Sequence, residues 1–175
     1  MKVFLDLDGV LVDFIRGVCE AFGRNDPSTN WCFWENWEGV TTKDVDKKCD
    51  VFFWESLYWT HDGREIEQAV RHKFSEQNIY PLTTPMPNPG SGTGKLEWIK
   101  RCIPWAYNRT IISSPGAPKS LLATHDTLLI DDKDENIAEF VAAGGRGILV
   151  PRPWNELCGW AGETLQVMKN SLEEF

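Results

Sequence analysis

A short apolar run at the start of the chain ends in two aspartates separated by one residue. Val3, Phe4 and Leu5 lead into Asp6 and Asp8. Such a run is typical of a buried strand in a parallel sheet, and ligands of these sheets bind outside the carboxyl ends of the strands. Residues i and i+2 of a strand point to the same side, so the two carboxylates can approach one centre. Because two like charges at one point cost free energy unless a cation or a proton offsets them, the pattern predicts a chemical role.

Two other interpretations of this motif are a calcium loop and a surface turn. An EF-hand calcium loop that began at Asp6 would need an oxygen ligand where Val10 stands and a glutamate where Gly17 stands. It would also need a helix before residue 6, for which there is no room. A calcium loop is therefore disfavoured, whereas an ordinary surface turn after a strand stays open as an alternative.

A second apolar run ends in the same way near the middle of the chain. Residues 127–130 are followed by Asp131 and Asp132. If this strand is a neighbour of the first, its acids converge with Asp6 and Asp8 at one edge of the sheet. Three carboxylates at one point are hard to explain without a metal, and Mg²⁺ prefers such oxygen ligands.

Strands and helices alternate in the second half of the chain. This alternation predicts an α/β fold with a parallel, Rossmann-like sheet. Residues 14–77 contain no obvious parallel strand, so we expect a small helical cap inserted after the first strand. Residues 1–13 and 78–175 then form the core domain. The predicted strands are 78–84, 109–114, 127–132 and 146–150, and the predicted helices are 94–101 and 134–143.

Large aromatic side chains gather in the predicted cap. They are Trp31, Phe33, Trp34, Trp37, Phe52, Phe53, Trp54, Tyr58 and Trp59. Most of them are expected to pack inside the cap, because a small domain needs large side chains to bury enough area. Some are expected to line the substrate pocket, and Phe33, Trp34, Trp54 and Trp59 are the candidates.

Composition limits the partners and the compartment. The chain has 175 residues and a net charge of −8, which argues against broad binding to a nucleic-acid polymer. No apolar stretch approaches the length of a membrane span, and no signal-peptide profile is seen. Five cysteines without a CxxC pair favour a reducing compartment. We therefore expect a cytoplasmic protein, and the sequence gives no indication of its oligomeric state.

Three further features follow or connect the predicted strands. Thr83 ends one strand and can donate a hydroxyl to a phosphate, although turn chemistry is an equal alternative. Lys119 lies in the loop before the second acidic strand, where it can neutralise a nucleophile and a phosphate or simply face solvent. The segment 90–95 looks like a phosphate-binding P-loop but lacks the required first glycine and the final Ser or Thr. We expect it to form a flexible turn before a helix that begins near Lys95, whose side chain can still contact substrate.

These motifs together resemble those of the haloacid dehalogenase (HAD) superfamily of phosphohydrolases. The segment 6–13 is similar to the first motif of that superfamily, Thr83 to the second, Lys119 to the third, and Asp131-Asp132 to the fourth. Within the superfamily the chain is most similar to the 5′(3′)-deoxyribonucleotidase family. This closer similarity rests on the segments 9–14, 82–85, 95–98 and 128–132.

The resemblance implies a role for each motif residue. Asp6 would be the nucleophile and a Mg²⁺ ligand. Asp8 would be the general acid/base, with its main-chain carbonyl on the metal. Thr83 and Lys119 would hold the phosphate. Asp132 would be the third metal ligand, and whether Asp131 also touches the metal is left open.

The sequence therefore predicts a Mg²⁺-dependent phosphatase that hydrolyses a small phosphomonoester through an aspartyl-phosphate. The expected substrate is a nucleoside 5′-monophosphate. A sugar phosphate or another phosphorylated metabolite is the alternative substrate. A non-catalytic aromatic binding module on the same scaffold is the alternative from a different class, although such a module need not keep a costly carboxylate cluster.

Overall fold

A computed structural model describes residues 1–25 and 30–175 of the chain. None of the helices in this described part is long and apolar enough to cross a bilayer. The strands are β1 Lys2–Leu5, β2 Ile79–Thr83, β3 Ile111–Ile112, β4 Thr127–Asp131 and β5 Arg146–Leu149. The α-helices are α1 Phe14–Phe22, α2 Thr42–Lys48, α3 Val51–Ser56, α4 Gly63–Lys73, α5 Gly90–Cys102, α6 Asp134–Ala142 and α7 Thr164–Glu173. Short 3₁₀ helices are η1 Phe33–Asn36, η2 Glu76–Asn78, η3 Pro104–Arg109, η4 Lys119–Leu122 and η5 Cys158–Trp160.

The strands form one parallel sheet in the order β3-β2-β1-β4-β5. The predicted α/β class is therefore confirmed. The two strands that end in acids are neighbours, and their register pairs Leu5 with Ile130. This pairing brings Asp6, which follows Leu5, to the same edge of the sheet as Asp131.

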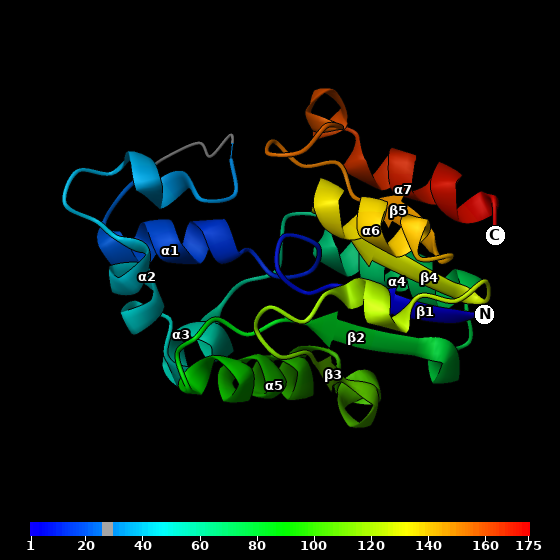
Figure 1. Ribbon diagram of the computed structural model, residues 1–175, viewed down its shortest axis with the longest axis horizontal. Helices are drawn as coiled ribbons and strands as arrows, with labels where there is room; N and C mark the ends of the chain where they lie inside the picture. The colour runs from blue at the N-terminus through cyan, green and yellow to red at the C-terminus, as the bar shows by residue number, and fades with distance from the viewer. Residues whose placement is uncertain (26–29) are drawn as a thin grey trace.

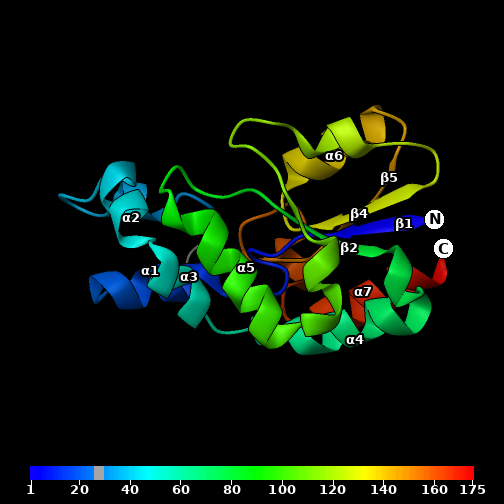
Figure 2. The same ribbon diagram turned by 90° about the horizontal axis from the view of Figure 1, so that it is seen from below.

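Alternating side chains on β1 and β4 serve both faces of the sheet. Val3 and Leu5 belong to the larger core cluster, together with residues of α4, α5 and α7. Phe4 and Leu129 belong to a smaller cluster that Phe140 of α6 completes. Figure 2 shows the resulting three layers, with α6 above the sheet and α4, α5 and α7 below it. Strands buried on both faces explain why their sequences are almost continuously apolar.

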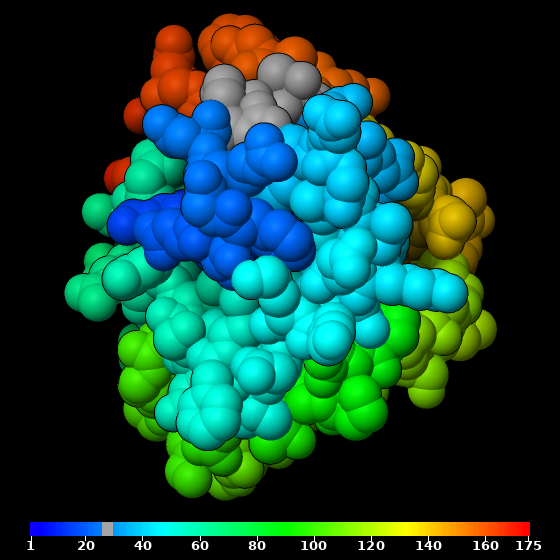
Figure 3. Space-filling model, turned by 90° about the vertical axis from the view of Figure 1, so that its left-hand side faces the viewer, coloured from blue at the N-terminus to red at the C-terminus, as the bar shows by residue number. Residues whose placement is uncertain are grey.

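The segment that follows β1 lies beyond the carboxyl ends of the strands. Figure 1 shows α1, α2 and α3 gathered there, at the end of the molecule opposite both termini. In Figure 3 the segments that carry these helices form most of the surface seen from that end. Helix α4, which follows them, packs against α7 on the lower face of the sheet. The boundaries of the cap as an inserted unit, 14–77, stay a prediction.

The glycine-rich segment before Lys95 is helical, so the expectation of a flexible turn there was wrong. Helix α5 begins at Gly90 and packs closely on α3. A Cβ at Gly94 would lie 2.5 Å from the carbonyl oxygen of Val51 and 2.6 Å from Cβ of Trp54. A Cβ at Gly90 would lie 2.8 Å from the backbone nitrogen of Val51. These glycines sit in a helix because their missing side chains let α3 approach.

We predict opposite effects on stability for alanine at two glycines of α5. Gly94→Ala should destabilise the fold, because its Cβ would collide with the backbone of α3. Gly92→Ala should stabilise it by about 0.5–1 kcal/mol, because alanine is the better helix former and its nearest new contacts are 3.9 Å away. Urea unfolding of the two variants measures both effects. Equal stabilisation by both substitutions would show that the α3–α5 contact is not tight.

Candidate active site

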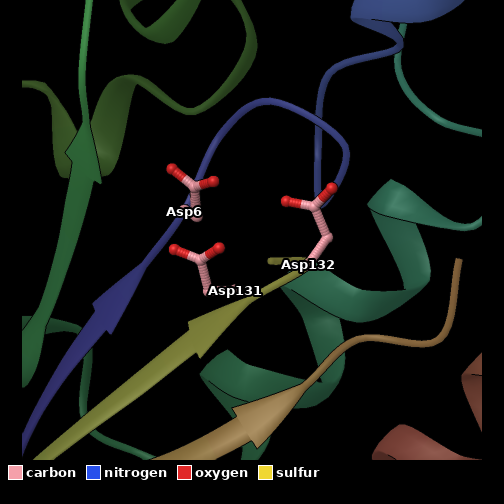
Figure 4. A group of neighbouring side chains, drawn as sticks. All are labelled: Asp6, Asp131 and Asp132. Carbon is pink, nitrogen blue, oxygen red and sulfur yellow. The ribbon is translucent and has the colours of Figure 1, made fainter. Parts of the chain in front are cut away.

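Three buried aspartates meet where β1 and β4 end. Asp6, Asp131 and Asp132 each offer a carboxylate oxygen within 4.8 Å of the others. Figure 4 shows Asp6 beside Asp131 on the neighbouring strands, with Asp132 one residue further along. Asp131 and Asp132 have no solvent exposure, and Asp6 is also buried. The cluster has the donor type, the spacing and the burial of a site for a hard divalent cation.

Burial and neighbouring carboxylates raise the pKa values of two carboxyl groups in the cluster. Burial, together with Asp131 and Asp8, raises the pKa of Asp6 to about 7 against the opposing effect of Lys119. Burial, followed by the charges of Asp131 and Asp6, raises the pKa of Asp132 well above its usual value. A bound cation would favour the ionised form of both groups.

Two carboxylate oxygens in this region are left without partners. Among the buried side-chain atoms of the described residues, Oδ1 of Asp8 and Oδ1 of Asp132 have no hydrogen-bond partner. The other oxygen of Asp132 accepts a 2.6 Å hydrogen bond from Nε1 of Trp154. Gly9 allows this close packing, because a Cβ there would lie 2.2 Å from Oδ2 of Asp132 and its φ is +77°. Leaving a buried oxygen without a partner costs free energy. The free oxygen of Asp132 is therefore suited to coordinate a cation.

Lys119 lies against the carboxylates from the loop before β4. Its Nζ is 2.6 Å from Oδ1 of Asp6 and 2.7 Å from Oδ2 of Asp131. Burial by itself would lower the pKa of Lys119, but the two carboxylates outweigh it and raise the pKa. Asp131 also accepts hydrogen bonds from the backbone of Lys133 and from Asn136. Asp131 is thus largely occupied by protein donors, whereas Asp132 keeps a free oxygen.

A second buried lysine, Lys95 of α5, serves Asp8 and Thr83. Its Nζ pairs with Oδ2 of Asp8 and donates a 3.0 Å hydrogen bond to Oγ1 of Thr83. The Lys95 ammonium also lies 4.1 Å from the ring centroid of Trp54. Only 1% of Lys95 is exposed. The predicted residues Asp6, Asp8, Thr83 and Lys119 are therefore brought together. Lys95, for which only a substrate contact was expected, pairs with Asp8.

A cavity of about 550 Å³ opens above Asp6 and Asp8. Its walls include Phe14, Trp31, Trp34 and Trp54 from the segment after β1. Trp34 and Trp54 were expected in this pocket, whereas the described lining does not include Phe33 or Trp59. Phe33 packs against Trp34 and Trp37, and Trp59 packs against Trp98.

The aromatic wall is a layered stack. Phe14 lies between Trp31 and Trp54, with ring centroids 5.8 and 5.1 Å away. Lys133 lies over the ring of Trp31, which also contacts Trp154. Phe14, Trp34 and Trp54 are buried, while Trp31 is partly exposed. Trp31 is therefore the most exposed of these four aromatic side chains.

Comparison with known proteins identifies the fold. No protein-family model and no curated protein matches this chain. A HAD hydrolase of family IA, variant 3, from Entamoeba histolytica aligns over 98% of this chain and 99% of its own, with 11% identity and a TM-score of 0.54. A HAD family hydrolase from Deinococcus radiodurans with bound phosphate and sodium aligns over 95% and 87%, with 16% identity and a TM-score of 0.52. CbbY from Rhodobacter sphaeroides, in complex with phosphate, aligns over 89% and 88%, with 12% identity and a TM-score of 0.52. At these identities the likeness is one of fold, and the chain has the fold of the HAD hydrolases.

Proposed function

We propose that this protein is a Mg²⁺-dependent phosphatase that hydrolyses a small phosphomonoester through an aspartyl-phosphate on Asp6. One observation carries the proposal: buried carboxylates on two neighbouring strand ends converge beside two buried lysines. A phosphoryl group needs cations around its oxygens and a carboxylate that can attack phosphorus. The phosphate bound to two of the structural neighbours supports the same chemistry.

The site fits a divalent cation. Asp6 and Asp132 would hold Mg²⁺ through their carboxylates and Asp8 through its main-chain carbonyl, and the unpartnered oxygen of Asp132 is an available ligand. When bound, the ion would neutralise the carboxylates and the charge of the phosphate. Asp131 is assigned to holding Lys119, because Lys119, Lys133 and Asn136 already donate to its oxygens.

The protein groups would divide the reaction into two steps. An Asp6 oxygen forms a bond to phosphorus while the ester P–O bond breaks, and Asp8 gives its proton to the leaving oxygen. Asp8 then takes a proton from a water, whose oxygen attacks phosphorus and releases phosphate and Asp6. Lys119, Lys95 and the hydroxyl of Thr83 would hold the phosphoryl oxygens. A phosphate beside Thr83 would compete with Asp8 for the Lys95 ammonium.

For the substrate we propose a nucleoside 5′-monophosphate. The support is the cavity of about 550 Å³ with aromatic walls above Asp6, since flat rings stack on bases. The similarity of the motifs to those of the 5′(3′)-deoxyribonucleotidases points the same way. The test is phosphate release from a panel of nucleotides and sugar phosphates, with Mg²⁺ and with excess chelator. A preference for sugar phosphates would support the alternative substrate instead of a nucleotide. Full activity in excess chelator would contradict the proposed dependence on Mg²⁺.

We predict that Trp31 contributes to substrate choice. Stacking of a base on an aromatic side chain is worth about 1–3 kcal/mol, so Trp31→Ala should raise KM for a nucleoside monophosphate about 5- to 150-fold. The KM for p-nitrophenyl phosphate should change little. Phe52→Ala is the control, because Phe52 is also an aromatic residue of the predicted cap but is 77% exposed and does not line this cavity. An unchanged ratio of the two KM values in Trp31→Ala would rule out stacking on this ring.

We also predict that Trp154 positions Asp132 for the metal. Trp154→Phe keeps the ring but removes the N–H that donates to Oδ2 of Asp132, and loss of such a partner weakens metal binding about 10–100-fold. The matched control is Trp105→Phe, which removes the indole donor to Glu67 away from the site. Calorimetric titration with Mg²⁺ gives the affinity without reference to catalysis. Equal Mg²⁺ affinity in both variants and the parent would show that Trp154 does not position Asp132 for the metal.

A further inference from the structure

A second groove lies between α4 and α5, away from the aspartates. It is a cavity of about 540 Å³ and shares no lining residue with the cavity above Asp6. Arg64, Gln68 and Arg71 come from one face of α4, and Arg101 and Cys102 come from the end of α5. Figure 2 shows the two helices below the sheet. We refer to this cavity as the α4–α5 groove.

The groove concentrates positive charge on an acidic protein. Three arginines and one carboxylate, that of Glu67, line it, whereas the whole chain has a net charge of −8. Arg71 neutralises the charge of Glu67 through a 3.2 Å ion pair and also forms an ion pair with Glu76. Among the described residues, no carboxylate forms an ion pair with Arg64 or Arg101. The groove therefore keeps two cations that no anion of the described chain offsets.

Both arginines line the groove beside Cys102. Their charges act on the Cys102 thiol, where they oppose the rise in its pKa caused by burial. Arg101 donates one hydrogen bond to the carbonyl of Glu55, and Arg64 lies over the ring of Trp59. Cations that line one groove without paired carboxylates favour an anion as the ligand. Guanidinium groups suit phosphate in particular, because their planar donors match its oxygens.

Flat rings form the other part of the groove. Arg64 lies 5.6 Å from the ring centroid of Trp59, and Arg71 lies 4.9 Å from that of Trp105. Nε1 of Trp105 donates to Glu67, which fixes the orientation of the ring. Arginines beside partly exposed aromatic rings are suited to a ligand that combines a phosphate with an aromatic ring. The net charge of −8 disfavours a long polyanion, and the volume is within the range of small-molecule pockets.

We propose that the α4–α5 groove is a second ligand site, which binds a small aromatic phosphate of the nucleotide class. Its phosphate would lie between Arg64 and Arg101, and its ring would stack on Trp59 or Trp105. The proposal does not depend on the reaction proposed for Asp6, because it uses none of the residues assigned to that reaction.

The test is calorimetric titration of the full chain in excess chelator with adenosine 5′-monophosphate, adenosine and inorganic phosphate as separate probes. Chelator leaves the four acids of the catalytic site without a cation, so that site should repel the phosphate. We expect the nucleotide to bind more tightly than either part alone, and Arg64→Gln/Arg101→Gln to weaken it at least tenfold. Arg146→Gln is the matched control, because Arg146 lies 5.7 Å from the ring centroid of Phe175, outside the groove. Retention of nucleotide affinity in the double variant, or no binding by the parent, would overturn the proposal.

Binding in the groove can be tested separately from the proposed catalysis at Asp6. The exposed arginines of the groove are not expected to affect folding, which thermal unfolding of the double variant checks. Phosphate release with Mg²⁺ is measured on the same variant. If the groove variant loses nucleotide affinity but keeps Mg²⁺-dependent hydrolysis, the second site stands alone. If hydrolysis by the parent fails while the groove binds, only the proposal for Asp6 fails.

Discussion

Asp6→Asn is expected to reduce phosphate release to background. The amide has nearly the same shape as the carboxylate, but it lacks the charge and the basic oxygen that attack phosphorus. Loss of a catalytic nucleophile lowers turnover by about 10⁴-fold or more. Phosphate release is measured with saturating Mg²⁺, so that a weaker metal site does not imitate a loss of chemistry. Substantial turnover in this variant would contradict the assignment of Asp6 as nucleophile.

Asp126→Asn is the matched control for this substitution. Asp126 precedes β4, at the opposite end of the strand from Asp131, and it pairs with the N-terminal amine at 3.2 Å. Its side chain is 64% exposed, so the change from acid to amide should leave turnover unchanged. A parallel loss of activity in both variants would indicate a general effect of charge on the protein rather than a role at the site.

The sheet could be predicted because its strands carry local signals. Residues 3–5 and 128–130 are apolar because both faces of the sheet are covered, and the acids follow where the strands end. Helix α6 was expected at 134–143 and spans Asp134–Ala142. The convergence of the acids required only that β1 and β4 be neighbours, and they are.

The sequence indicated a substrate contact for Lys95 but not its pairing with Asp8. Its partner Asp8 is 87 positions away in the chain, and no local pattern announces such a contact. One signal was available. Ser91, Gly94, Lys95, Trp98 and Ile99 are buried at helical spacing, so the position of Lys95 relative to Trp98 and Ile99 predicts that its ammonium lies inside the protein. A buried lysine needs an anion, and the acids at the strand ends supply one.

The placement of the aromatic rings could be predicted only in part, because Trp34 and Trp54 line the expected pocket whereas Phe33 and Trp59 do not. Trp59 and Trp54 are similar in kind and close in sequence, yet Trp54 lines the cavity above Asp6 and Trp59 lines the α4–α5 groove. Their placement depends on how α3 packs against α5. That packing is close because Gly90 and Gly94 have no side chains to collide with α3. Trp154 likewise reaches Asp132 across 22 positions of the chain, from a loop that has no regular pattern.

Arg152 lies behind the loop that follows β1 and holds it in place. It is buried, and its two terminal nitrogens each lie 2.8 Å from an oxygen of Asp62. It also donates to the carbonyl oxygens of Gly9 and Val10. Burial alone would raise the pKa of Asp62, but Arg152 outweighs this effect and holds the pKa below its usual value. The pair thus fixes the backbone that leads from Asp8 to α1.

Asp62→Asn is expected to destabilise the fold by about 3–5 kcal/mol at neutral pH, because it leaves the buried Arg152 without a negatively charged partner. Glu20→Gln is the control, because it breaks an ion pair to Arg16 of which both side chains are more than half exposed, and such pairs are worth about 0–1 kcal/mol. A carboxyl whose pKa is lowered on folding stabilises the protein above its unfolded pKa of about 3.9. This stabilisation is lost as the pH falls through the folded pKa, so the difference between the parent and Asp62→Asn should shrink below about pH 4. Urea unfolding at several pH values measures that difference, and a difference that grows toward acid pH would contradict the ion pair as its source.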